Sequence, residues 1–385
     1  MKPLACVVGD LSLVRALGRG GLPVALAAAS EPDSRIGLSR YCVAVVRTPS
    51  WVDQPDAALA ALVAWAGGER EAPVLFYQGD HDLLALSRGR ERLAPHLRCL
   101  LPPAALVEDL VDKLRFAALA QRQRLPVPVT LDLQRRSGLR FPCVLKPATR
   151  SPRFAQLAAC QKAVRIESAA GLERLLPLLE GCKSDFVLQE AIEGGEQRVV
   201  SYHAYIRPGG ELMAEFTGRK IRTSPPVYGM STYVEITDDP EVRRLGRSVL
   251  ERIGFSGVAK IDFKRDARTE RLHLLEINPR FNLWHHAGAA AGVSIPALVY
   301  RDCVEPGSAR PAGPARPGVR WMNARDDWRA FDGSHARWLA EMLTCHVNES
   351  LLWRDPLPAA DDVRGIVARK LAKLREARPR LGSAR

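Results

Sequence analysis

The chain has 385 residues, of which 46% are hydrophobic and 26% charged, and its formal net charge is +13. This length allows two or three globular domains. No stretch approaches the ~20 apolar residues of a membrane helix, so no membrane span is expected. The eight cysteines lack the close spacing of a zinc or redox pair, which favours reduced thiols in a cytoplasmic protein. The basic residues follow no nucleic-acid-binding pattern, and no nucleic-acid partner is expected.

Short apolar runs alternate with helical patterns over the first hundred residues. Strands are predicted at Leu4–Val8, Leu22–Ala27, Tyr41–Val46 and Pro73–Tyr77, and helices at Leu11–Arg19 and Ala57–Ala66. Such alternation indicates a parallel sheet with crossover helices, so residues 1–104 are predicted to form a Rossmann-like α/β domain. The first turn lacks the G-x-G-x-x-G spacing, which argues against dinucleotide binding there.

The pattern changes to α+β after Pro102. The predicted elements are a helix at Glu108–Gln123, strands at Cys143–Lys146 and Phe186–Gln189, a hairpin over 198–217, a helix over 241–253, and paired strands at Val258–Lys264 and Leu272–Ile277. Residues 105–304 are therefore predicted as a second, two-lobed domain. Residues 305–318 have the Pro- and Gly-rich composition of a linker. Residues 319–385 form a C-terminal segment with a basic tail, whose role the sequence leaves open.

The strongest chemical signal is Asp262, followed fourteen residues later by Glu276-Ile277-Asn278-Pro279-Arg280. Alternate side chains of a strand share a face, so Glu276 and Asn278 are expected to project together, with Asp262 on the neighbouring strand. Two carboxylates and an amide oxygen form the hard oxygen cluster that Mg²⁺ prefers. Arg280 is placed to contact a phosphoryl or carboxylate oxygen. The alternative is an exposed hairpin with ordinary surface charges.

Two lysines and one strand end add to this signal. Asp112-Lys113 is also interpreted as the opening of the helix that ends at Pro126, and Lys146 ends a buried strand, where an ammonium needs an anion. The strand Val187–Gln189 emerges into Glu190-Ala191-Ile192, followed by Glu196. Its backbone groups suit an adenine edge and its carboxylates suit ribose hydroxyls. Each motif alone is weak, because most such lysines and acids are merely solvated.

In this order the motifs resemble the ATP-grasp superfamily over about residues 105–300. The resemblance implies two α+β lobes that hold ATP between them, preceded by an α/β domain. It implies phosphate binding by Lys113 and Lys146, and nucleotide binding by Gln189, Glu190, Ala191, Ile192 and Glu196. It further implies that Asp262, Glu276 and Asn278 bind Mg²⁺, for which Mn²⁺ can substitute. Arg280 is implied to lie beside the reacting carboxyl phosphate.

Three stretches that are less specific than the metal motif are similar to the D-aspartate ligase-like carboxylate–amine ligases: Gly9–Leu17, Ser39-Arg40-Tyr41 and Thr217–Pro226. One departure concerns the phosphate flap, because relatives have a glycine-rich loop after the strand lysine and this chain has Pro147–Arg153. The resemblance implies transfer of the ATP γ-phosphoryl to a carboxylate, followed by amine attack. Arg280 is predicted to stabilise the oxyanion, with Lys220 or Arg222 closing over the site.

Several alternatives stay open from the sequence. A carboxylase of the same superfamily and a catalytically silent nucleotide-binding regulator are the competing functions. The expected partners are a small carboxylate and a small amine whose identities are unknown, and a homodimer stays open. Asp80 and His81, at a predicted strand end, and the paired His285 and His286 are further candidates for substrate contact.

Overall fold

The computed structural model describes residues 2–29, 35–136, 138–149, 163–180, 185–349, 354–361 and 364. The predicted flap from residue 150 onward and the basic tail from residue 365 onward lie outside the described residues. Across the part that is described, no helix is both long enough and apolar enough to cross a bilayer.

The N-terminal residues form a five-stranded parallel sheet in the order β3-β2-β1-β4-β5. Its strands are β1 (Ala5–Val8), β2 (Val24–Ala28), β3 (Cys42–Arg47), β4 (Val74–Tyr77) and β5 (Arg98–Cys99). Its helices are α1 (Leu11–Arg19), η1 (Arg35–Leu38), α3 (Pro55–Gly67), α4 (Asp80–Arg88) and α5 (Arg90–Leu93). The fully buried β1, β2 and β4 explain the continuous apolar runs of the sequence. The order in which the strands are added reverses at β1 and β4, and open sheets of this kind bind ligands at such a point.

The predicted helix over Glu108–Gln123 is two helices, α6 (Ala104–Val111) and α7 (Lys113–Arg122). They meet at Asp112, whose backbone is extended and whose carboxylate accepts hydrogen bonds from the amides of Leu114 and Arg115. The prediction of one continuous helix was wrong, because Asp112 acts as an N-cap instead of a helix-interior residue. The break puts Lys113 at the first position of α7.

A four-stranded antiparallel sheet follows, in the order β6-β9-β7-β8. Its strands are β6 (Thr130–Asp132), β7 (Cys143–Pro147), β8 (Val164–Ile166) and β9 (Phe186–Glu190). It is accompanied by η2 (Leu133–Arg135), α9 (Ala169–Leu175) and η3 (Leu176–Leu179). One face of this sheet packs with α9 and η3 into a small separate core.

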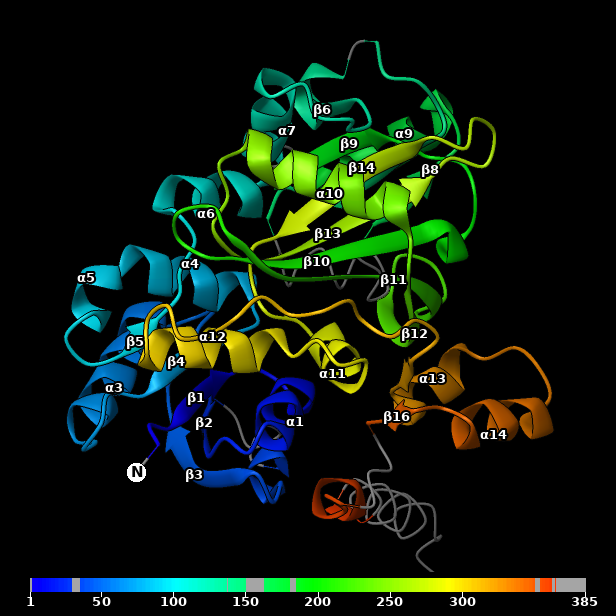
Figure 1. Ribbon diagram of the computed structural model, residues 1–385. Helices are drawn as coiled ribbons and strands as arrows, with labels where there is room; N and C mark the ends of the chain where they lie inside the picture. The colour runs from blue at the N-terminus through cyan, green and yellow to red at the C-terminus, as the bar shows by residue number, and fades with distance from the viewer. Residues whose placement is uncertain are drawn as a thin grey trace, which may run out of the picture.

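A seven-stranded sheet, in the order β14-β13-β10-β11-β12-β15-β16, forms the centre of the molecule (Figure 1). Its strands are β10 (Val199–Ile206), β11 (Leu212–Ser224), β12 (Met230–Thr237), β13 (Gly257–Arg265), β14 (Leu272–Asn278), β15 (Arg320–Met322) and β16 (Val347–Asn348). The remaining helices are η5 (Glu196–Arg198), α10 (Pro240–Arg252), α11 (Trp284–Ala290), α12 (Ile295–Val304), α13 (Ala324–Ala330) and α14 (His335–Leu343).

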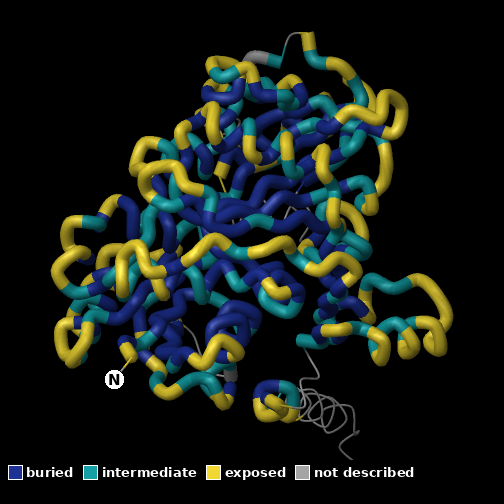
Figure 2. The backbone as a smooth tube through the Cα atoms, in the orientation of Figure 1, coloured by how far each residue is buried: buried dark blue, intermediate teal, exposed yellow. Residues whose placement is uncertain are grey.

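Two hydrophobic cores cover the two faces of this large sheet. On one face, α7 and α10 pack against β10, β13 and β14. On the other, α11 and α12 lie between the sheet and the N-terminal domain, so that one continuous core includes β1, β4 and β12. Figure 2 shows the buried strands at the centre of the molecule, whereas α14 has no buried residue.

Residues 305–318, predicted as a linker, form neither helix nor strand but are bonded to the large sheet. The amide of Ala312 donates to the carbonyl of Met213, and that of Gly318 to the carbonyl of Ile236. The C-terminal segment then adds β15 and β16 to the sheet edge. It also returns to the N-terminal domain, where the buried Arg15 donates to Asp355 at 2.8 Å. The domain boundaries drawn from the sequence stay predictions.

Candidate active site

The pairing of β13 with β14 gathers the predicted metal ligands on one face. Asp262 lies directly opposite Glu276, and Lys260 directly opposite Asn278. Opposed residues of an antiparallel pair project to the same side of the sheet, so these four side chains share a face. The period-two expectation from the sequence therefore matches the register of the two strands.

Asp262 is buried among donors. Its carboxylate accepts hydrogen bonds from the Lys260 ammonium at 2.7 Å and from the Ser201 hydroxyl, and the Lys220 ammonium lies 4.0 Å away. Burial by itself raises the pKa of Asp262, but the charges of Lys260 and Lys220 outweigh it and hold the pKa below its usual range. Asp262 is thus kept ionised, as a cation ligand must be.

The donor set fits a magnesium site completed by phosphate and water. Among the described residues, no three His, Cys, Asp or Glu side chains gather closely enough to enclose a metal by themselves. Asp262, Glu276 and Asn278 instead offer two carboxylates and one amide oxygen. Mg²⁺ is typically held by one or two carboxylates together with substrate phosphates and water, so this incomplete set suits it better than a structural metal.

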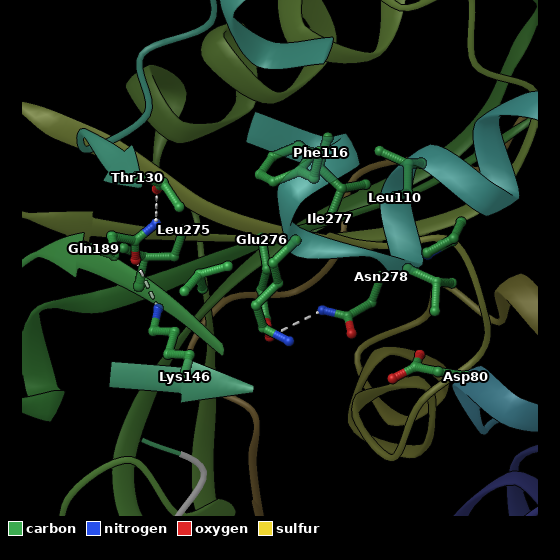
Figure 3. Close-up of a pocket in the computed structure, with 14 residues that line it drawn as sticks. Asp80, Leu110, Phe116, Thr130, Lys146, Gln189, Leu275, Glu276, Ile277 and Asn278 are labelled. Carbon is green, nitrogen blue, oxygen red and sulfur yellow. Dashed lines mark hydrogen bonds between the residues drawn. The ribbon is translucent and has the colours of Figure 1, made fainter. Parts of the chain in front are cut away.

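Arg280 is tied to other protein groups. Its Nε donates to the carboxylate of Asp80, and its Nη2 donates to Oδ1 of Asn278 at 2.9 Å. The Nδ2 of Asn278 in turn donates to Oε1 of Glu276 at 3.1 Å (Figure 3). Arg280 is buried and does not line the cavity described below, although it adjoins Asn278, which does.

The two predicted phosphate lysines approach from different elements. Lys113 lies at the start of α7, and its Nζ donates to the carbonyl of Ala148 at 3.4 Å. Lys146, on β7, donates to Oε1 of Gln189 at 2.7 Å. Burial lowers the pKa of Lys146 to about 8, an effect opposed by Glu276 and reinforced by the neighbouring lysines. Lys146 therefore needs an anion nearby to keep its charge above this pH.

Gln189 is held in one orientation. Its Nε2 donates to the hydroxyl of Thr130 at 2.9 Å, and that hydroxyl donates to the carbonyl of Pro128 at 3.2 Å. Figure 3 shows the chain of contacts from Thr130 through Gln189 to Lys146. Since a lysine only donates, both neighbours require the amide oxygen of Gln189 to face Lys146.

One cavity of about 630 Å³ lies between the four-stranded and seven-stranded sheets. Apolar walls come from both sheets, including Val144 of β7 and Leu275 of β14. The predicted site residues that line it are Lys113, Lys146, Gln189, Glu190, Ile192, Glu196, Lys220, Asp262, Glu276 and Asn278. This volume and this mixture of apolar walls with a few charged groups are those of a small-molecule site.

Three predicted residues are not among the lining residues. The backbone N–H of Ala191 donates to the carbonyl of Pro142. This N–H was expected to face adenine, but it is already hydrogen-bonded within the protein. Arg280 lies behind Asn278, as described above. Arg222 points away from Lys220 because a bulge at Ile221 shifts the register of β11 against β12.

Arg222 lies in a buried ion-pair network instead. Its guanidinium donates to Asp327 on α13 at 2.7 Å and to Glu341 on α14 at 2.6 Å, and it covers the ring of Tyr233. Asp327 also accepts hydrogen bonds from Thr232 and from the indole of Trp338. The structure thus gives Arg222 a role in fastening the C-terminal segment to β11, and not in closing over the cavity as the sequence suggested.

The candidate substrate contacts separate into two groups. Asp80 and His81, at the carboxyl end of β4, line the cavity from the N-terminal domain. His285 and His286 are fully buried in α11 and are absent from its lining. Burial lowers the pKa of each of these two histidines to about 3, so both are neutral core residues.

Sequence reasoning missed four residues at the site: Thr130, Ser201, Lys260 and Lys264. Lys260 and Lys264 alternate with Asp262 along β13, so the period-two argument applied to Asp262 could have identified both. Ser201 and Thr130 carried no signal, because their importance comes from pairing with β13 and β9 across long stretches of chain.

A scan against protein-family models found no match. A D-aspartate ligase from Enterococcus faecium is 25% identical over 217 residues, which are 52% of this chain and 52% of that protein. The chain thus matches about half the length of this relative. Solved structures match more broadly. An L-amino acid ligase from Bacillus licheniformis superposes with a TM-score of 0.60 at 17% identity, covering 81% of this chain and 78% of the other.

Two further structures are similar. A biotin carboxylase from Campylobacter jejuni gives a TM-score of 0.60 at 13% identity, over 79% of this chain and 71% of the other. An N5-carboxyaminoimidazole ribonucleotide synthetase from Thermus thermophilus gives 0.57 at 18% identity, over 82% and 81%. The chain has the ATP-grasp fold of these structures and is similar in sequence to a D-aspartate ligase. The superfamily fold accounts for the cavity between the two sheets, and the resemblance stated from the motifs is confirmed.

Proposed function

We propose that this ATP-grasp protein is an ATP-dependent ligase that activates a small carboxylate and joins it to an amine. The observation that carries the proposal is the shared cavity, in which Lys113 and Lys146 meet Asp262, Glu276 and Asn278. Cations for the phosphates and oxygen ligands for Mg²⁺ are the parts that phosphoryl transfer requires. The biotin carboxylase neighbour was solved with an ATP analogue, which supports a nucleotide in the equivalent cavity.

The residues of the chain have distinct parts in the proposed reaction. Val144 and Leu275 enclose the base, and Glu196 binds the ribose. The ammonium groups of Lys113 and Lys146 bind the phosphates, and Asp262, Glu276 and Asn278 would hold Mg²⁺. Bound Mg²⁺ would neutralise charge on the phosphate oxygens. Most of the rate enhancement then comes from positioning and charge stabilisation.

Two steps complete the reaction. A carboxylate oxygen of the substrate attacks the γ-phosphorus of ATP, which gives an acylphosphate and releases ADP. The amine nitrogen then attacks the acyl carbon, the carbon–oxygen bond to phosphate breaks, and the amine loses a proton. The products are an amide, ADP and phosphate. Lys220, which lines the cavity, and Arg280, which contacts Asn278 of its lining, are the proposed stabilisers of negative charge in these steps. Arg222 is omitted because it points away from the cavity toward Asp327 and Glu341.

The substrate class is proposed from the relatives. One is named a D-aspartate ligase and another an L-amino acid ligase, so at least one substrate is proposed to be an amino acid. The carboxylase alternative rests on structural neighbours at 18% identity or less, which share the fold. In that reaction bicarbonate replaces the organic carboxylate.

A product screen tests the proposal. Purified protein with MgATP is offered pairs of amino acids, single amino acids, and bicarbonate with each amine, and phosphate release is followed together with product masses. A ligase releases phosphate only when a carboxylate and an amine are both present, and forms a product lighter than their sum by one water. Phosphate release that needs bicarbonate would favour the carboxylase, and nucleotide binding without turnover would favour a regulator.

A further inference from the structure

Asp80 belongs to the N-terminal domain but reaches the strand that carries the proposed metal ligands. It is the first residue of α4, directly after the carboxyl end of β4, and it lines the cavity. Its carboxylate accepts a hydrogen bond from Nε of Arg280, two hundred residues later in the chain. The Arg280 side chain is only 8% exposed, so its charge has little access to water.

The same guanidinium determines how the Asn278 amide is turned. Arg280 can only donate, and it contacts Oδ1 of Asn278 at 2.9 Å. The carboxylate of Glu276 accepts, and it contacts Nδ2 of Asn278 at 3.1 Å. Both neighbours therefore require one orientation of the amide. Its oxygen keeps a second lone pair that a cation can use.

Asp80 decides where this guanidinium lies. Of the acidic groups near Arg280, Asp80 has the largest effect on its pKa, followed by Asp82 and Glu276, and Asp10 also lies within the influence of its charge. Without the Asp80 charge, Asp82 and Glu276 remain, and of these two Glu276, the exposed carboxylate of the proposed metal set, lines the cavity. A guanidinium turned onto Glu276 would compete with a cation for this carboxylate and would release the Asn278 oxygen.

We propose that Asp80 is a positioning residue for the divalent-cation site, acting through Arg280. It keeps the Arg280 guanidinium on the Asn278 oxygen and away from Glu276, and it thereby couples the N-terminal domain to the cation bound with the nucleotide. The inference rests on the proposed function, because it requires a cation on Glu276 and Asn278. Partners that orient metal ligands in this way typically change metal affinity about 10- to 100-fold when they are mutated.

Mn²⁺ binding tests this role without turnover. Free Mn²⁺ is measured by electron paramagnetic resonance in titrations of the full chain with a non-hydrolysable ATP analogue, and the analogue is also titrated without metal. Asp80→Asn is expected to weaken Mn²⁺ binding about 10- to 100-fold while metal-free binding of the analogue stays within about twofold of wild type. Asp80→Glu, which keeps the charge, is expected to recover part of the Mn²⁺ affinity.

Glu108→Gln is the matched control. Glu108, on α6, binds Arg88 of α4, the helix of Asp80, at 2.8 and 2.9 Å, and neither residue is among the cavity-lining residues, so its loss removes an arginine–carboxylate pair without touching Arg280. This variant is expected to bind Mn²⁺ like wild type. If it weakens Mn²⁺ binding as much as Asp80→Asn does, the effect belongs to α4 as a whole and the inference is overturned.

Other outcomes of these titrations also test the inference. Unchanged Mn²⁺ affinity in Asp80→Asn overturns the inference, as does an equal loss of metal-free nucleotide binding. Wild-type protein that binds neither the analogue nor Mn²⁺ overturns the proposed function instead. If Asp80→Asn does not melt cooperatively, Arg280→Lys replaces it, because a lysine can pair with Asp80 but lacks the planar fork that reaches Asn278 as well. Wild-type Mn²⁺ affinity in that variant overturns the inference.

Discussion

Nucleotide binding is expected to weaken as the pH rises through 8, because Lys146 loses its charge there. Burial and the neighbouring Lys113, Lys220 and Lys264 lower the pKa of Lys146 to about 8, although Glu276 opposes the shift. The lowered pKa of Lys146 determines the sign of the pH effect on nucleotide affinity. Below pH 7 the free protein already carries the ammonium that the phosphates require, and above pH 8 a proton must be taken up on binding. Bound phosphates stabilise the ammonium and raise its pKa again.

The expected magnitude follows from the protonated fraction of Lys146. With a pKa of about 8, roughly nine-tenths of the free protein carries the charge at pH 7 and roughly one-tenth at pH 9. Affinity for a non-hydrolysable ATP analogue should thus fall about tenfold over this range. Isothermal titration calorimetry at pH 7, 8 and 9 measures this fall. In buffers of different ionisation enthalpy it also detects the expected uptake of one proton at pH 9.

Two variants isolate the group responsible. Lys146→Arg stays charged throughout, so its affinity should be nearly independent of pH whatever its absolute value. Lys264→Met removes one of the charges that lower the pKa of Lys146, so the fall in affinity should remain but move to higher pH. Wild-type affinity that is constant within twofold from pH 7 to 9, or an unchanged slope in Lys146→Arg, would refute the reasoning.

Three further predictions concern single side chains. Thr130→Val leaves the Gln189 amide without its acceptor and should weaken nucleotide binding about fivefold by calorimetry, whereas Thr130→Ser should bind normally. Arg280→Ala should lower turnover roughly a hundredfold or more in a phosphate-release assay, and near-normal turnover would remove it from the mechanism. Asp327→Ala removes one of the two carboxylates that pair with Arg222 and should lower the free energy of unfolding in urea by about 3 kcal/mol; a loss below about 1 kcal/mol would contradict the network.

Much of the candidate site was open to prediction because its signals are local. Asp262, Glu276 and Asn278 follow the two-residue repeat of a strand, and they lie in two strands joined by a short turn. A short turn leaves few possible registers, so the motif implies the convergence that the structure displays. The lysines were weaker predictions. Lys113 and Lys146 meet only because α7 and β7 pack on the same cavity, and only the resemblance to ATP-grasp proteins paired them in advance.

Other residues were beyond local reasoning. One extra residue in β11, at Ile221, turns Arg222 toward α13 while Lys220 keeps its place near Asp262. Such a bulge depends on how two strands and a helix fit together, which no periodicity records. The break at Asp112 was a local signal: aspartate is among the preferred N-cap residues, and the helix start predicted at Asp112-Lys113 is that of α7, although the helix predicted from Glu108 ran across it.

Periodicity and residue chemistry within short stretches were enough to predict the alternating elements of the N-terminal residues and the shared face of Asp262, Glu276 and Asn278 on β13 and β14. Contacts between distant segments were decided only when the chain folded: Asp80 with Arg280, Gln189 with Thr130, and the C-terminal strands on the edge of β12. The physical reason is that strand and helix periods act over a few neighbouring residues. Pairing across hundreds of residues depends on which buried surfaces and charges the whole fold can satisfy together.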